Sequence, residues 1–147
     1  MEKFKSFLSP EEKKAIEEEI SKAESKTSGE IRVHLIGKPG IKDAMPVAKK
    51  WFVKLKMHKT RDRNGILLLV APVSRKFAIL GDKAINEKIG DNFWSGIRDR
   101  IQSSFSESKY ATGIIMAVKE TGAILEKFFP IKPDDVNELS NEITESN

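Results

Sequence analysis

Residues 60–70 read TRDRNGILLLV, and in this stretch alternating charge passes directly into an unbroken apolar run. The run continues to Pro72, so apolar side chains occupy consecutive positions and therefore both faces of an extended chain. A strand is apolar on both faces when helices cover its sheet on both sides. The stretch predicts the central strand of such a sheet, with charged side chains at its entrance.

The segment EIRVHLIG, residues 30–37, predicts a second strand with a different exposure. Apolar and polar side chains alternate in it, which is typical of a half-exposed strand. The outward row would be Glu30, Arg32 and His34. Between the two strands, residues 43–57 carry a wide apolar stripe at helical spacing. A right-handed crossover through this helix would make the two strands parallel.

Residues 73–82, VSRKFAILGD, follow the central strand after only a few turn residues. A connection this short cannot cross over the sheet, so this third strand must return antiparallel as a hairpin. The three strands and their helices predict an α/β domain with a small mixed sheet.

The first helix has a clear start signal. Ser9 and Glu12 form a capping box, with Pro10 at the first helical position. We expect this helix to end near Gly29, since glycine readily adopts the left-handed conformation that closes a helix.

Later helices and the C-terminal end are marked by single residues. Asp82 is expected to cap a short helix and Asp91 a longer one, while Pro130 should stop the last helix. We therefore place one domain at residues 1–131. Residues 132–147 predict an acidic C-terminal arm, docked through Val136 and Leu139.

Composition excludes several classes of function. The chain has 147 residues, 39% of them hydrophobic, and no cysteine, so disulfides, thiolate metal sites and cysteine nucleophiles are excluded. No apolar run approaches the roughly 20 residues that span a bilayer. The net charge of +4 is spread among interleaved acids and bases, which does not favour nucleic acid. We expect a cytoplasmic monomer without a membrane segment.

Hairpin geometry brings polar residues together at one end of the predicted sheet. Asp62, Arg63 and Asn64 precede the central strand, Asp82 ends its antiparallel partner, and Glu30 begins its parallel neighbour. Carboxylate and amide oxygens without imidazole or thiolate are the ligands of hard cations, Ca²⁺ or Mg²⁺. The alternative interpretation assigns each residue a separate local role: a solvated turn residue, a helix cap or a strand-end surface charge.

Six motifs, in this order, resemble those of the TPM domain family, a thylakoid-lumen and bacterial domain also called TPM-domain phosphatase: TSGEIRVHLIG, MHKTRDRNGILLLVAP, KFAILGD, DNFWSGI, FFP and NELSNEI. The resemblance extends from about Phe4 to Ile143. It implies a Rossmann-like α/β/α sandwich with a mixed, mostly parallel small sheet. Many members are tethered in the periplasm or lumen, and plant members take part in photosystem II repair. The present sequence resembles the short free-standing bacterial members, to which a lumenal role does not carry over.

Some members of the family bind divalent cations or have acid phosphatase activity, and the resemblance implies a polar cluster here. That cluster would consist of Asp62, Arg63, Asn64 and Asp82. Glu30 or Asp91 would complete the metal ligands, and Asp134 with Asp135 forms a second candidate group. A phosphatase without cysteine would need a metal-bound water as nucleophile, with Arg63 as the catalytic cation on the phosphoryl oxygens.

Two functions therefore follow as hypotheses. The first is a TPM-domain protein that binds Ca²⁺ or Mg²⁺ and has at most weak, metal-dependent phosphomonoesterase activity. The second is a non-catalytic interaction module, in which the outward row Glu30, Arg32 and His34 and the acidic arm dock an unidentified protein partner.

Overall fold

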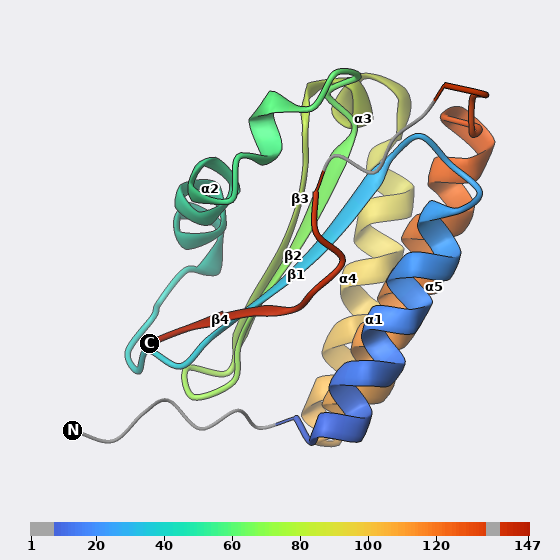
Figure 1. The fold of residues 1–147 in the computed structure, drawn as a ribbon. Helices are drawn as coiled ribbons and strands as arrows, with labels where there is room; N and C mark the ends of the chain where they lie inside the picture. Colours follow the sequence, from blue (N-terminus) through green and yellow to red (C-terminus); the bar gives the residue numbers. More distant parts are fainter. Residues whose placement is uncertain (1–7, 135–138) are drawn as a thin grey trace.

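A four-stranded mixed sheet forms the centre of the computed structural model, which describes residues 8–134 and 139–147. Its strands are β1 (Glu30–Ile36), β2 (Gly65–Ala71), β3 (Lys76–Gly81) and β4 (Thr144–Ser146). They lie in the order β3-β2-β1-β4 (Figure 1). β1 is parallel to both β2 and β4, whereas β2 and β3 are antiparallel. The predicted parallel pair and hairpin are confirmed.

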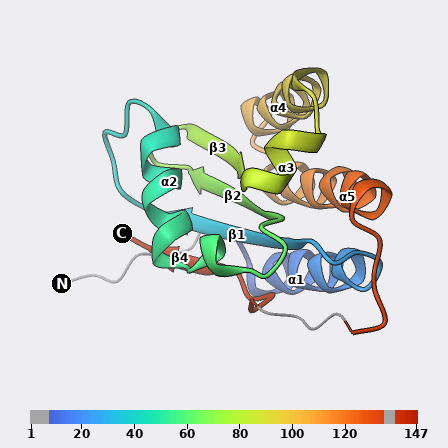
Figure 2. The ribbon, with the colours of Figure 1, turned by 90° about the horizontal axis from the view of Figure 1, so that it is seen from above.

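Helices cover both faces of this sheet. They are α1 (Pro10–Glu24), α2 (Ala44–Lys54), α3 (Lys83–Lys88), α4 (Asp91–Ser106) and α5 (Tyr110–Phe128), with a 3-10 turn η1 (Met57–Lys59). Figure 2 shows α1, α4 and α5 on one side of the sheet and α2 on the other. The molecule is thus an α/β/α sandwich, as expected. No helix in the described part of the chain has the length and apolar character needed to cross a membrane.

β2 explains why two helical layers are needed. Its alternate residues Ile66, Leu68 and Val70 join the core beneath α1, α4 and α5. The intervening Leu67, Leu69 and Ala71 join the core beneath α2. All seven residues of β2 are buried, and each fully buried Leu or Ile side chain contributes about 1.5–3 kcal/mol. The unbroken apolar run therefore contributes side chains to two hydrophobic cores, one on each face of the sheet.

The first helix begins as predicted and ends earlier. The Ser9 amide donates to Glu12 Oε1 at 2.8 Å, and the Glu12 amide donates to Ser9 Oγ at 3.1 Å, which is the expected capping box. The helix ends at Glu24, with Ser25 in a right-handed cap, so the prediction for Gly29 was wrong. Gly29 instead permits close packing, because a Cβ there would lie 2.8 Å from the side chain of Leu125 on α5.

The predicted caps of the two later helices differ in outcome. Asp82 caps α3 as expected, accepting a 2.8 Å hydrogen bond from the Lys83 amide. Asp91 does not cap α4, because Gly90 occupies the N-cap position and Asp91 is the first residue of the helix. A carboxylate in the first turn still interacts favourably with the helix dipole.

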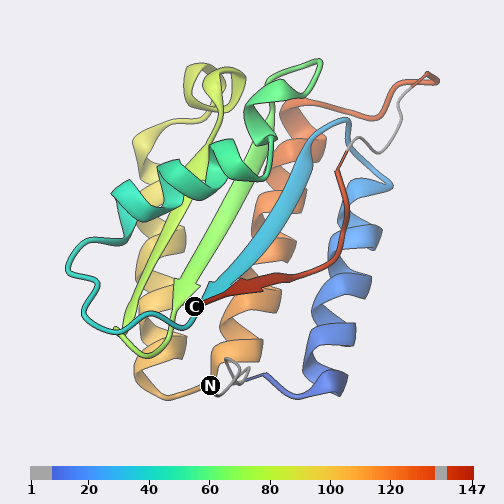
Figure 3. The same cartoon turned by 60° about the vertical axis from the view of Figure 1, so that its left-hand side comes forward.

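The C-terminal segment extends the sheet at its outer edge. β4 pairs with the last residues of β1, from His34 opposite Thr144 to Ile36 opposite Ser146. Leu139 packs on the core beneath α2, as predicted, whereas Val136 lies outside the described residues. Figure 3 shows this segment running alongside β1 to the C-terminus.

Candidate functional site

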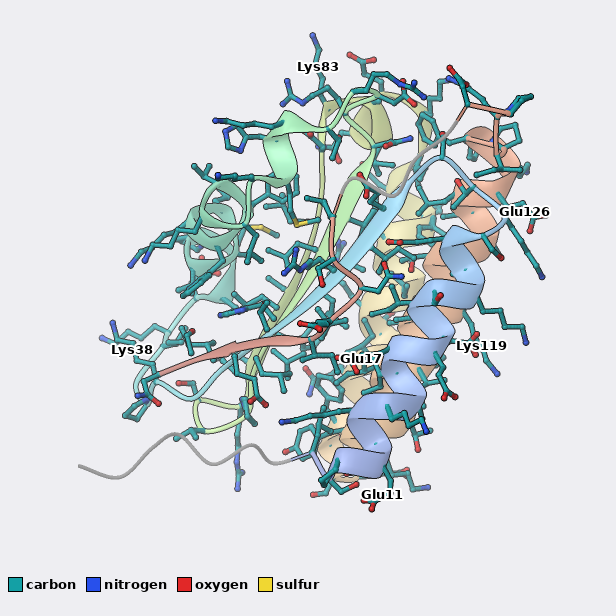
Figure 4. All side chains as sticks on the ribbon, viewed as in Figure 1. Glu11, Glu17, Lys38, Lys83, Lys119 and Glu126 are labelled. Carbon is teal, nitrogen blue, oxygen red and sulfur yellow. The ribbon has the colours of Figure 1, made fainter. Side chains whose placement is uncertain are left out.

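The predicted polar residues lie around one end of the sheet, where β1 and β2 begin and β3 ends. Glu30 pairs with Gly65 in the parallel register, and Ile66 pairs with Gly81 in the antiparallel one. The Asp82 amide donates to the Gly65 carbonyl at 2.9 Å, so the two chain segments meet at this end. Lys83, labelled in Figure 4, projects outward from the same end.

Arg63 and Asp82 form the tightest charged contact of this region. Arg63 Nε donates to Asp82 Oδ2 at 2.7 Å and Arg63 Nη2 donates to Asp82 Oδ1 at 2.8 Å. Asp82 is buried, whereas the Arg63 side chain is 46% exposed. The hydrogen bonds to Asp82, together with its charge, raise the pKa of the Arg63 guanidinium. Both carboxylate oxygens of Asp82 are therefore engaged by a cation of the protein itself.

Asn64 and Glu30 are also engaged within the fold. Asn64 is buried, and its Nδ2 donates to Ser28 Oγ at 3.1 Å. Glu30 Oε1 accepts a 2.6 Å hydrogen bond from the amide of Leu139. Glu30 thus fixes the C-terminal segment against the start of β1.

A second group of charges surrounds Arg61. Arg61 Nε lies 3.6 Å from Asp62 Oδ1, and Arg61 Nη1 lies 3.5 Å from Asp134 Oδ2. Lys132 Nζ lies 3.7 Å from the other oxygen of Asp62. Two carboxylates from distant parts of the chain therefore share one guanidinium. Asp135, the other member of the predicted second group, lies outside the described residues.

The six residues predicted for the site thus do not converge on one point. Asp82 lies with Arg63, Asn64 with Ser28, and Asp62 with Arg61 and Lys132. Within the residues that the structure describes, Asp91 is exposed at the start of α4 and forms no ion pair with the other five. Across that same part of the chain, no three His, Asp or Glu side chains are placed to hold a metal ion together.

The prediction of an exposed polar row on β1 was wrong. Glu30 is 4% exposed and His34 is fully buried, and Arg32 is half-buried. The cover comes from the C-terminal segment, which also bonds to α1: the Ile143 amide donates to Glu17 Oε2 at 2.9 Å. Glu17, labelled in Figure 4, lies between α1 and this segment. Two members of the row, Glu30 and His34, are therefore internal, and only Arg32 is partly exposed.

His34 is held by contacts on both ring nitrogens. Its Nδ1 lies 2.6 Å from Thr144 Oγ1 and its Nε2 lies 2.8 Å from Ser146 Oγ. The ring stacks on Trp51 of α2, with 3.9 Å between the centroids. Burial, assisted by the charge of Arg32, lowers the pKa of His34 to about 4. The imidazole is neutral at pH 7 and ties β4 to β1.

Glu24 is the notable side chain that sequence reasoning missed. Its Oε2 accepts a 2.7 Å hydrogen bond from the Ile31 amide, while its Oε1 is buried and has no hydrogen-bond partner among the described residues. Burial raises the pKa of Glu24 to about 8, against the opposing effect of the Ile31 hydrogen bond. A signal was present in the sequence, because Glu24 continues the four-residue spacing of Ile16 and Ile20 on the buried face of α1.

Comparison with known proteins places the chain in context. The family model described as the TPM domain matches residues 1–124. No curated protein matches significantly. Among solved structures, the NMR structure of BA42 protein from the psychrophilic bacterium Bizionia argentinensis is 42% identical, with a TM-score of 0.88. The match covers 99% of each chain. The chain belongs to the TPM domain family.

Proposed function

We propose that this protein binds a divalent cation, Ca²⁺ or Mg²⁺, at the end of the sheet where β1 and β2 begin. The carboxylates of Asp62 and Asp134 would be the protein ligands, and water would complete the coordination. The observation that carries the proposal is that Arg61 lies within 3.5–3.6 Å of an oxygen from each carboxylate. A cation of the protein thus contacts both carboxylates, and in this proposal a metal ion replaces it.

The ion pairs of Arg61 with Asp62 and Asp134 contribute little to stability. The Arg61 side chain is 49% exposed and that of Asp134 is 77% exposed, and exposed ion pairs contribute only about 0–1 kcal/mol. A dication attracts the two carboxylates more strongly than a single guanidinium does. With only two carboxylates we expect weak binding, with a dissociation constant of about 10⁻⁴–10⁻³ M, the range of low-affinity Ca²⁺ modules.

Asp82, Asn64 and Glu30 are less suited as ligands and have another role in this proposal. Asp82 gives both oxygens to Arg63 and also accepts from the Lys83 amide. Breaking this arrangement would leave a buried carboxylate to be satisfied again, which costs more than releasing an exposed pair. Asp82 and Asn64 hold the loop that carries Asp62, and Glu30 holds the C-terminal segment.

Phosphatase activity at this site would be weak at most. A bound dication would supply a water molecule of lowered pKa. Arg63 is the cation available to contact phosphoryl oxygens, since Asp82 fixes its orientation and nearly half of its side chain is exposed. A fixed guanidinium of this kind binds and orients an anionic group.

The test is a titration of the metal-stripped, isotope-labelled protein with Ca²⁺ and then with Mg²⁺, monitored by proton-nitrogen NMR. We expect saturable shifts at residues 61–64 and 132–134. Asp62→Asn should weaken binding at least tenfold. Arg61→Gln should strengthen it roughly fivefold, because it removes a competing unit charge worth about 1 kcal/mol at this distance. A generic phosphomonoester is then added to the loaded protein to measure turnover.

Two further variants make the assignment falsifiable. Asp99→Asn makes the same charge change on the exposed surface of α4 and should leave the affinity unchanged. Asp82→Asn should change it less than twofold. Loss of binding in Asp82→Asn but not in Asp62→Asn would show that the buried carboxylate of Asp82, and not Asp62, is the metal ligand. The absence of any saturable shift would refute cation binding at this end of the sheet.

A further inference from the structure

A cavity of about 300 Å³ lies at the other end of β2. It is enclosed by the β2–β3 hairpin on one side and by the end of α4 and the start of α5 on the other. β2 has seven residues, so the cavity is about 20 Å from the polar end of the sheet. Open α/β sheets bind ligands beside the carboxyl ends of their parallel strands, and β2 ends here. The volume is at the lower end of the range for small-molecule sites.

Three aromatic rings form one wall of this cavity. Phe77 and Phe105 meet edge to face with their centroids 5.4 Å apart, and Tyr110 lies 5.2 Å from Phe105. All three pack against the larger core yet are only partly buried. The core thus fixes the rings in position while part of each borders the cavity. A fixed aromatic wall favours a flat apolar group, since little side-chain entropy is lost when such a ligand binds.

The rim of the cavity is polar and carries positive charge. Arg75 and Lys76 are exposed and line it, together with Gln102 and Ser108. None of the described residues that line the cavity is acidic. An arginine and a lysine beside an aromatic wall are suited to a carboxylate or a phosphate.

Backbone geometry holds two of these rim residues in place. Arg75 closes the hairpin with φ at 55°, and Ser108 closes α4 with φ at 60°. The amide of Lys109 donates to the carbonyl of Ser104 and that of Ser108 to the carbonyl of Phe105, both at 2.9 Å, which is a Schellman ending. Glycine adopts this backbone conformation without strain. Arginine and serine occupy positions where glycine is the conformationally favoured residue, and both border the cavity.

From the aromatic wall, the cationic rim and the enclosed volume, we infer that this cavity binds a small molecule in which an aromatic ring carries a carboxylate or a phosphate. The ring stacks against Phe105 and its neighbours. The anionic group lies at the mouth, beside Arg75 and Lys76. This site is separate from the proposed cation site and does not depend on it.

The test uses four probes in proton-nitrogen NMR titrations of the full chain: benzoate, phenyl phosphate, uncharged benzyl alcohol and inorganic phosphate. We expect saturable shifts at residues 75–77 and 105–110 with both aryl anions. Benzyl alcohol and inorganic phosphate should each bind at least fivefold more weakly. The tighter of the two aryl anions identifies which anionic group the site prefers.

A matched pair of double variants separates a built site from general attraction. Arg75→Gln with Lys76→Gln should weaken the aryl anions roughly tenfold and leave benzyl alcohol unchanged. Lys49→Gln with Lys50→Gln removes the same charge from exposed positions on α2 and should change no affinity. Equal effects of the two pairs would overturn the inference, as would shifts of phenyl phosphate confined to residues 61–64 or the absence of saturable shifts at the cavity.

Discussion

Replacing Glu24 with glutamine should change how the stability of this protein depends on pH. The pKa of Glu24 is about 8 in the folded state, against 4.5 for the ordinary side chain. Between these values the unfolded chain carries a carboxylate while the folded protein keeps the proton. The contribution of Glu24 is therefore fully present below pH 4.5, falls as the pH rises, and is lost above about pH 8.

His34 acts in the opposite direction over a lower window. Its pKa is about 4 in the folded state, against 6.5 for the ordinary side chain. The neutral ring is retained on folding, so its contribution is present above pH 6.5 and is lost as the pH falls towards 4. Between pH 4.5 and 6.5 the two groups oppose each other. Above pH 6.5 the contribution of His34 is constant, so of these two groups only Glu24 still changes the stability as the pH rises.

The expected magnitude follows from these windows. From pH 6.5 to 8 the free energy of unfolding of the wild type should fall by about 2 kcal/mol, because each pH unit between the folded and unfolded pKa values corresponds to about 1.4 kcal/mol. Glu24→Gln should remove this decline. The glutamine carbonyl can still accept from the Ile31 amide, which now bonds to Glu24 Oε2 at 2.7 Å, so the fold is retained.

Urea denaturation at several pH values, followed by tryptophan fluorescence and circular dichroism, measures the effect. Glu18→Gln is the control, since it makes the same change at an exposed position of the same helix. The control should follow the wild-type curve. A decline between pH 6.5 and 8 that persists unchanged in Glu24→Gln would refute the assignment of the raised pKa to this carboxyl.

Three further outcomes follow from the packing. Gly29→Ala should lower the free energy of unfolding by about 1–3 kcal/mol in urea denaturation, because the new methyl group meets the buried Leu125 at 2.8 Å; wild-type stability would contradict that close approach. Thr144→Val should lower the free energy of unfolding by about 1 kcal/mol, because it removes the hydroxyl that contacts His34. It should also speed amide hydrogen exchange in β4, and unchanged exchange would show that this contact does not hold β4 in place. Asp82→Ala should lower the free energy of unfolding by at least about 1 kcal/mol more than Asp82→Asn does, since asparagine can still cap α3. Equal denaturation midpoints of the two variants would show that the side chain of residue 82 does not stabilise the helix as a cap.

The sequence was most informative where local pattern and tertiary environment agree. The apolar run of β2 predicted burial on both faces, and the short connection after it predicted the hairpin. The alternating pattern of β1 was misleading, because its polar row is covered by residues about 110 positions later in the chain. That covering segment has no strong pattern of its own. The sequence pattern of such a polar row is the same whether its side chains bond to water or to a hydroxyl group that is distant in the sequence.

For the candidate site, it was easier to predict which residues meet at one end of the sheet than which side chains contact each other there. Sheet register brings Asp82 and Asn64 to one end of the sheet, which hairpin geometry alone can predict. Arg63 makes its bidentate contact with Asp82 from a left-handed backbone conformation, with φ at 53°, which hairpin geometry does not predict. Carboxylates that converge in a sequence argument can thus be held apart by the cations between them.

The position of β4 also constrains the order in which the chain can fold. β1 meets β2 at a separation of 35 residues, from Glu30 to Gly65, whereas its other edge meets β4 at a separation of 110, from His34 to Thr144. Contacts distant in sequence form slowly, because a long loop must close first. During synthesis the outer edge of β1 therefore stays unpaired long after the rest of the sheet can assemble. An open edge of this kind can pair with another chain, so completion of the last strand removes a route to aggregation.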